Sequence, residues 1–165
     1  MNVKDAIRTR HAVRQFRPDP IPDEVLEAIL NAGRRSQSSK NRQWWQFIVI
    51  KDRERLKALS TAGDFAQHLI GAPLAIALVG TQENPWNAFD LGQVAALMQL
   101  EAHELGIGSC IANFHRPDEA RAILGVPADH YVMGAISFGY PASDYKPSKM
   151  GGRKPLDEVV HWEKW

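Results

Sequence analysis

The sequence lacks long hydrophobic runs and cysteine pairs, and each absence excludes a class of protein. Its longest apolar stretch, residues 72–80, is far shorter than the roughly 20 residues that a helix needs to cross a bilayer. The first ten residues contain no apolar signal-peptide core. The single cysteine, Cys110, can form neither an internal disulfide nor a cysteine metal cluster. We therefore expect a cytoplasmic protein with no membrane partner.

The signatures of several enzyme classes are missing as well. There is no Walker A loop, GxGxxG turn, HExxH helix or GxSxG elbow, which argues against nucleotide hydrolysis, Rossmann binding, zinc proteolysis and serine hydrolysis. None of the six histidines pairs with another at metal-ligand spacing, so no metal site is predicted. The pattern is typical of proteins in which a cofactor carries the reactive atoms.

What the chain does contain is an ordinary globular composition. Of its 165 residues, 44% are hydrophobic and 24% are charged. The length suits one domain, and no internal repeat divides it. We therefore predict a single domain over residues 1–165.

The formal net charge of +1 conceals an uneven distribution. Residues 1–57 carry 13 Lys or Arg against 7 Asp or Glu, residues 58–145 carry 2 against 9, and residues 146–165 carry 5 against 3. Both ends are therefore basic. Either these charges are solvated on helix surfaces, or the two ends converge on one anion. Nucleic acid is not the expected partner, because the net charge is near zero and no long basic stripe with interleaved aromatics is present.

Hydrophobic periodicity and capping residues predict a few strands separated by helices. The longest predicted helix covers residues 87–105 and ends before Gly106, with Leu91, Val94, Ala95, Met98, Ala102 and Leu105 on its buried stripe. Further helices are predicted over 2–10, 23–36, 53–59, 65–70 and 117–124, and strands over 46–51, 74–79, 110–112 and 131–138. This pattern indicates an α+β or α/β protein with a small sheet of unspecified strand order.

The first of two informative segments is RTRHAVRQF, residues 8–16. It puts four cationic or potentially cationic groups at a predicted helix end. If the helix continues, Arg10 and Arg14 share a face and can fork around one phosphate. A basic helix terminus that complements the helix dipole is the simpler interpretation.

The second segment, SQSSKNRQWW, covers residues 36–45 and precedes an apolar strand. Its hydroxyl and amide side chains suit a ligand with many carbonyl and ring-nitrogen positions, such as an isoalloxazine. A polar turn after a helix C-terminus accounts for the same residues equally well.

Together and in this order, the two segments resemble the FMN-dependent nitroreductase family. The family patterns R-R/H-S-x-R/K-x-F and S-S-x-N-x-Q-P-W are matched by RHAVRQF and SSKNRQWW, and further matches are LGIGSC at 105–110, FGYP at 138–141 and RKPLDEVV at 153–160. The resemblance covers essentially the whole chain. It implies an α+β fold with three α/β/α layers, in which helices, one of them long and central, flank a small mixed or antiparallel sheet. It also implies a homodimer with non-covalently bound FMN at the subunit interface.

The resemblance further implies where each part of the FMN would bind. The basic start of the chain would hold the ribityl phosphate and the pyrimidine edge, the tail would close over the phosphate, a backbone stretch would line N5 and O4, and the serine-rich segment would reach the flavin of the neighbouring subunit. In that order, the residues are Arg10, His11, Ala12 and Arg14; Arg153; Ile111, Ala112 and Asn113; and Gln37, Ser38, Ser39 and Asn41.

The chain also departs from the family pattern. Ala12 replaces the usual serine, so that only its backbone can serve the cofactor, and Trp44 stands where proline is common. The chain is short for the family, which leaves little room for inserted helices above the substrate. We therefore expect a more open pocket.

The implied activity is oxidation of NAD(P)H coupled, in ping-pong order through flavin N5, to reduction of nitroaromatics, quinones or similar small conjugated electrophiles. No side chain would be catalytic; Arg10 or His11 would stabilise the reduced flavin, and Trp44, Trp86 or Phe114 would stack on the acceptor. Three alternatives stay open. They are another flavin chemistry on the same fold (enone or aldehyde reduction, dehalogenation, flavin fragmentation), a flavin-binding module without turnover, and an anion-binding protein without flavin.

Overall fold

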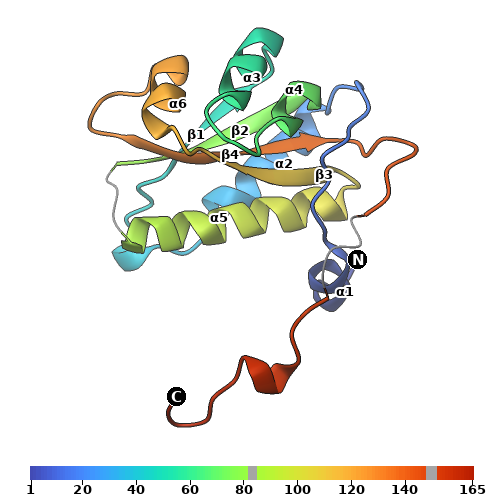
Figure 1. The fold of residues 1–165 in the computed structure, drawn as a ribbon, viewed down its shortest axis with the longest axis vertical. Helices are drawn as coiled ribbons and strands as arrows, with labels where there is room; N and C mark the ends of the chain where they lie inside the picture. Colours follow the sequence, from blue (N-terminus) through green and yellow to red (C-terminus); the bar gives the residue numbers. More distant parts are fainter. Residues whose placement is uncertain (82–84, 148–151) are drawn as a thin grey trace.

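The computed structural model describes residues 1–81, 85–147 and 152–165 around a four-stranded sheet (Figure 1). The strands are β1 (Gln46–Ile50), β2 (Leu74–Gly80), β3 (Gly108–Asn113) and β4 (Tyr131–Gly139). Their order is β1-β2-β4-β3, and all neighbouring strands run antiparallel. The sheet is therefore antiparallel, and β3 forms one of its two edges.

Helices cover both faces of this sheet and make three layers, as expected. On one face lie α2 (Asp23–Arg34) and α5 (Pro85–Glu104); on the other lie α3 (Arg53–Ser60), α4 (His68–Gly71) and α6 (Pro117–Leu124) (Figure 1). Alternation along β2 divides the core between the faces, because successive strand residues point to opposite sides. Leu74, Ile76 and Leu78 pack in the first cluster, and Ala75, Ala77 and Val79 in the second.

The long helix α5 is apolar on nearly all sides. Leu91, Val94 and Met98 are buried against the sheet and α2, whereas Phe89 and Leu97 are exposed on the outer side. A helix of this kind is normally covered all round. The exposed side of α5 is therefore a surface that the chain itself does not cover.

The first helix, α1 (Val3–Thr9), is capped by Asn2 and ends about where predicted, since Arg10 already has extended backbone angles (φ −57°, ψ 129°). Arg10 and Arg14 therefore do not share a helical face. Leu105, predicted on the buried stripe of the long helix, follows the last residue of α5 and is exposed.

The C-terminal tail, residues 152–165, runs away from the sheet and contains one short 3₁₀ turn, η2 (Leu156–Glu158) (Figure 1). Of the helices in the described ranges, none combines the length and the apolar character that crossing a membrane requires.

Candidate functional site

The basic segment after α1 is fixed by its backbone beside the edge strand β3. Val13 N–H donates to the carbonyl of Ser109 (2.9 Å), and Arg17 N–H donates to the carbonyl of Tyr140 (2.9 Å). Gly108 permits this approach, because a Cβ at that position would clash with the side chain of Val13. The extended segment therefore presents its side chains along the start of β3.

Beyond Ser109, the outer side of β3 has no strand beside it. In an antiparallel ladder, alternate residues direct their N–H and C=O groups to opposite sides of the strand. Since the Ser109 carbonyl faces outward to Val13, Ile111 and Asn113 also direct their backbone groups away from β4. This edge offers donors and acceptors in a row to a planar ligand.

The far end of the β3 edge is closed by the loop between α3 and α4. Arg116 donates to the carbonyl of Thr61 (2.9 and 2.6 Å) and to the Asp64 carboxylate (2.8 Å). The hydrogen bond from Arg116 holds the pKa of Asp64 below its usual value. Gly63 lies so close to the carbonyl of Asn113 that a Cβ would clash with it. The open edge is thus bounded by the basic segment at one end and by this loop at the other.

A buried polar relay, which the sequence did not indicate, lies beside the middle of β3. His68 on α4 is 8% exposed, and its Nδ1 lies 2.9 Å from the Ser137 hydroxyl, which donates to the carbonyl of Cys110 (3.2 Å). The Ser137 hydroxyl has one proton, so the tautomer of His68 decides whether this hydroxyl donates to Nδ1 or to the Cys110 carbonyl. Nε2 is buried and has no hydrogen-bond partner among the described residues.

The positive charge of Arg14 acts on two groups of this relay, His68 and Cys110. Burial lowers the pKa of His68 to about 4, and the nearby Arg14 guanidinium contributes to the shift, while the Ile111 backbone opposes it. Burial also raises the pKa of Cys110, which is therefore a neutral thiol, again with Arg14 close by. The guanidinium of Arg14 therefore lies near the middle of β3, beside a neutral imidazole.

Two residues that precede Arg14 line a cavity at the C-terminal end of α5. Arg10 and His11 line a cavity of about 220 Å³ together with His103 and Ser109. The His11 ring stacks on Tyr145 (centroids 5.8 Å apart, planes at 4°). The phenol of Tyr145 donates to the Ala12 carbonyl (2.5 Å), so the Ala12 oxygen already has a partner within the chain.

The serine-rich residues occupy a different part of the molecule. Gln37 donates to Gln93 on α5 (2.7 Å), and the Ser38 hydroxyl accepts from Gln43 N–H (3.0 Å). Ser39 lines a cavity of about 290 Å³ beside Asp90 of α5, and Asn41 follows in the same loop with positive φ.

This loop and the basic segment contact α5 at distant points, Gln93 and His103. At 1.5 Å per residue, these lie about 15 Å apart along the helix, and the two segments lie near opposite ends of α5 (Figure 1). One chain therefore does not bring the two predicted groups together.

Arg153, the remaining predicted residue, lies in the tail beyond the body of the molecule. It is exposed, as are the apolar tail residues around it.

The aromatic side chains predicted to stack on the substrate differ in their exposed fraction. Phe114 is 5% exposed within the core, so its assignment to substrate stacking is wrong. Trp86 is 76% exposed, while Trp44 is half-buried and its indole N–H donates to Asp90 (3.1 Å). Phe65, which was not predicted, is 82% exposed in the loop that closes the β3 edge.

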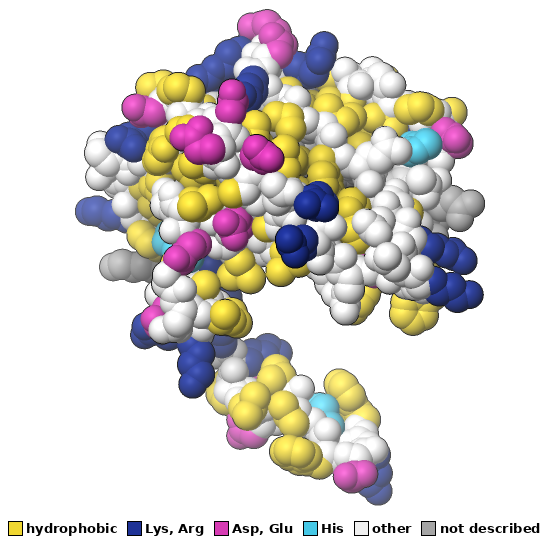
Figure 2. All heavy atoms as spheres, turned by 180° about the vertical axis from the view of Figure 1, so that it is seen from behind, with side chains coloured by type: hydrophobic (Ala, Val, Ile, Leu, Met, Phe, Trp, Pro, Cys, Tyr) yellow, Lys and Arg dark blue, Asp and Glu magenta, His cyan; other side chains and the backbone are white. Residues whose placement is uncertain are grey.

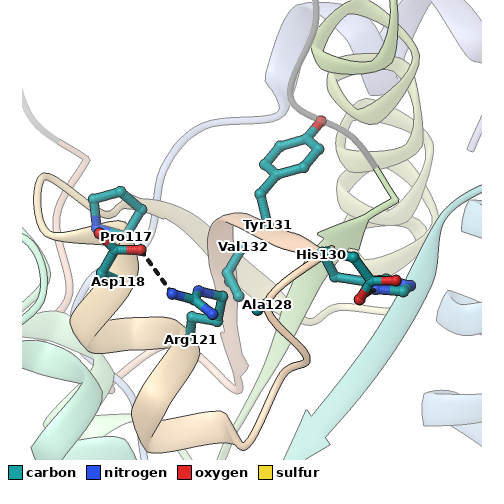
Figure 3. Close-up of a pocket in the computed structure, with 8 residues that line it drawn as sticks. Pro117, Asp118, Arg121, Ala128, His130, Tyr131 and Val132 are labelled. Atoms are coloured by element: carbon teal, nitrogen blue, oxygen red, sulfur yellow. Dashed lines mark hydrogen bonds and ion pairs between the residues drawn. The ribbon is translucent and has the colours of Figure 1, made fainter.

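A further cavity of about 300 Å³ lies between α6 and the chain leading into β4 (Figure 3). The charged groups around it are paired locally, Arg121 with Asp118 (3.1 Å) and His130 with Asp129 (2.8 Å). The described ranges contain no group of three His, Cys, Asp or Glu side chains that could hold a metal ion. The β3 edge is therefore the better candidate site.

Known proteins match this chain over most of its length. The family model described as Nitroreductase family matches residues 7–64 and 60–140. A relative from Archaeoglobus fulgidus that carries an NADH dehydrogenase/NAD(P)H nitroreductase name is 33% identical over 168 residues, which are 96% of each chain. The NADH dehydrogenase of Thermus thermophilus is 28% identical over 202 residues, covering 98% of this chain and 96% of that protein.

Solved structures share the fold as well. The structure of an FMN-dependent nitroreductase from Clostridium difficile has a TM-score of 0.88 at 29% identity, covering 99% of this chain and 100% of that one. The expected three-layer arrangement around a small sheet is therefore confirmed.

The neutral state of His68 predicts a dependence of stability on pH. The imidazole binds a proton near pH 6.5 when unfolded but only near pH 4 when folded, so the unfolded state gains protons first as the pH falls. The free energy of unfolding should therefore fall by up to about 3 kcal/mol between these pH values. Urea unfolding of the wild type and of His68→Phe, at one protein concentration, should show this loss in the wild type alone. Equal losses in both proteins would contradict the assignment.

Proposed function

This chain belongs to the nitroreductase family, and on that premise we propose that it is an FMN-dependent NAD(P)H oxidoreductase that reduces nitroaromatics, quinones or similar small conjugated electrophiles. One observation carries the proposal. The cationic motif of residues 10–14 runs directly into an open strand edge at Ile111 and Asn113. A ligand with an anionic tail and a planar, hydrogen-bonding head matches that arrangement.

The donor set along the edge fits FMN. Arg10 and His11 carry cationic or potentially cationic groups suited to a phosphate, and Arg14 adds a guanidinium near the middle of β3. The outward backbone groups of Ile111 and Asn113 suit the carbonyl and nitrogen positions of an isoalloxazine.

When bound, FMN supplies the redox chemistry by accepting a hydride at N5 from NADH or NADPH and reducing a second substrate in ping-pong order. The chain's own contribution is binding and electrostatics. The Arg14 charge stabilises negative charge that develops at the pyrimidine end, a role that geometry favours for Arg14 over Arg10 or His11. The closed loop around Asp64 and Arg116 holds the far end of the edge in place.

The site is completed, in this proposal, by a second copy of the chain. Phe89 and Leu97 on α5, and Val3 and Ile7 on α1, are exposed apolar side chains. The tail adds further exposed apolar residues, which lie among charged ones along the projecting segment (Figure 2). They are Leu156, Val159, Trp162 and Trp165.

Large contiguous apolar patches are rare on monomers and mark association sites, and these exposed side chains are the candidates for such a site. In a homodimer built on this surface, Gln37, Ser38, Ser39 and Asn41 of one copy reach the flavin of the other. The tail then lies across the partner and brings Arg153 to the phosphate.

The purified protein should be yellow, release FMN on denaturation and oxidise NADH or NADPH when a quinone or a nitroaromatic is present. The absorbance of the flavin and of the nicotinamide reports both steps. A bound flavin that neither nicotinamide reduces would contradict the enzymatic proposal and favour a binding module. A colourless protein that binds no added FMN would contradict the cofactor itself.

Arg14→Ala should raise the Kd for FMN on the order of tenfold or more, because a hydrogen bond to a charged group contributes about 1.5–3 kcal/mol. Arg153→Ala should act in the same direction if the tail reaches the phosphate. Fluorescence titration of flavin-free protein measures both. Arg8→Ala is the matched control, since Arg8 belongs to the same basic segment but pairs with Asp5 on the exposed side of α1. Unchanged affinity in Arg14→Ala would refute the assignment.

Wild-type protein should sediment as a dimer at micromolar concentration. Leu97→Arg places a charge on the exposed side of α5 and should yield monomers that retain FMN poorly. Ile70→Arg is the control, because Ile70 is similarly exposed but lies on α4, across the sheet. A monomeric wild type that keeps its flavin would show that one chain suffices.

A further inference from the structure

The cavity at the C-terminal end of α5 contains a histidine to which the proposed function assigns no role. His103 lines this cavity of about 220 Å³ together with Arg10, His11 and the start of β3. Of the described residues that line it, none is acidic. The cavity therefore holds one fixed positive charge and two imidazoles that can each bind a proton, and no carboxylate to balance them.

Hydrogen bonds to α1 orient the His103 ring. Its Nε2 lies 2.8 Å from the Thr9 hydroxyl, and that hydroxyl lies 2.7 Å from the Asp5 carbonyl. When the Thr9 proton is directed to the Asp5 carbonyl, which only accepts, the hydroxyl oxygen accepts from Nε2–H of the imidazole. A protonated His103 fits this arrangement and still has Nδ1–H to donate to a ligand.

His11 gains a donor in a similar way. Its Nδ1 lies 2.8 Å from the Thr9 carbonyl, which only accepts, so Nδ1 carries a proton. Nε2 of a neutral His11 is then an acceptor, and a second proton turns it into a donor. The rings of His11 and His103 lie edge to face with their centroids 6.2 Å apart. A proton on either ring therefore adds a donor beside the same small cavity.

Without an anion in the cavity, a proton on His103 is unfavourable. Burial lowers the pKa of His103, and the charges of His11 and Arg10 lower it further, while Glu104 opposes them. The ring is therefore neutral at pH 7 in the protein alone. An anion that enters the cavity counters the repulsion among these groups and favours the protonated ring.

The charged side chains on the two helices beside the ring do not supply this negative charge. On α1, Asp5 binds Arg8 (3.0 Å), and on α5, Glu104 binds the amino terminus of the chain. Tyr145 stacks on His11, and burial raises the pKa of its phenol, which therefore stays neutral. The negative charge that matches this cavity has to come from a ligand.

We propose, resting on the FMN-dependent function above, that His103 is a further phosphate-binding residue and that FMN binds together with a proton taken up from the solvent by this ring. Nδ1–H of the protonated His103 donates to a phosphate oxygen, beside the fixed charge of Arg10. FMN therefore binds more weakly as the pH rises and the ring loses this proton. At acidic pH the phosphate itself takes up a proton near pH 6, so the attraction is strongest close to neutral pH.

The test follows the His103 ring by NMR in protein labelled with ¹⁵N-histidine, without flavin and loaded with FMN. The pKa of His103 should be higher in the FMN-loaded protein. Riboflavin, which has no phosphate, should leave this pKa near its flavin-free value. Calorimetry of FMN binding at pH 7, in two buffers of different ionisation enthalpy, should show uptake of about half a proton or more. The Kd for FMN should then rise roughly threefold or more per pH unit above neutrality.

Variants assign the proton to its residue. His103→Gln keeps an amide that can bond to Thr9 but cannot bind a proton, so the uptake should fall by at least half and the Kd for FMN at pH 7 should rise several-fold. His130→Gln is the matched control, because His130 pairs with Asp129 just before β4 and does not line this cavity. This control should keep the full proton uptake.

An unchanged pKa of His103 in the FMN-loaded wild type would overturn the inference, and so would full proton uptake in His103→Gln. The wild-type spectra decide the matter even if a variant fails to fold. A wild type that binds no FMN would overturn the proposed function and this inference with it. Binding of FMN without proton uptake overturns the inference alone.

Discussion

The hydrogen bond from Val13 N–H to the Ser109 carbonyl is the constraint on which the site depends. It ends helical geometry before the basic segment is complete, because an extended backbone is needed to run beside β3. It also sends the side chains of Arg10 and Arg14 to different places, one to the end of α5 and the other to the middle of the strand. A continued helix would have put both on one anion. The extended segment instead spreads positive charge from the end of α5 to the middle of β3.

The open edge of β3 explains why binding of a planar cofactor, as proposed, would require few side chains. An edge strand supplies backbone donors and acceptors whose positions are set by the sheet, so a planar cofactor needs no dedicated polar residues there. Two side chains make this edge asymmetric, the Arg14 guanidinium and the neutral His68 imidazole beside it. Burial keeps the imidazole neutral, since a second cation beside Arg14 would be unfavourable in that environment.

The limits of a helix were predicted well where residues next to those limits determine them. Pro117 and Gly125 bound α6 at its predicted limits, because proline favours the first helical turn and Gly125 takes the left-handed conformation that ends it. The pairing of β2 with β4 could not be predicted, since it joins segments far apart in the chain. The helix predicted up to about residue 10 does end there, whereas the extended path of the residues that follow depends on a tertiary backbone hydrogen bond that local signals do not reveal.

The residues of the candidate site show the same contrast between local motifs and contacts that only the fold creates. Arg10 and Arg14 belong to a contiguous motif and were found in the sequence, whereas His68 is one histidine within an apolar stretch with no neighbour that marks it. Its buried contact with Ser137 arises only when β3 and β4 align Cys110 with Ser137 and α4 packs over them. The serine-rich loop presents the opposite case, with a clear motif that a single chain leaves distant from the basic segment. In the proposed homodimer, burial of the uncovered outer side of α5 would carry the loop of a second chain to the strand edge of the first.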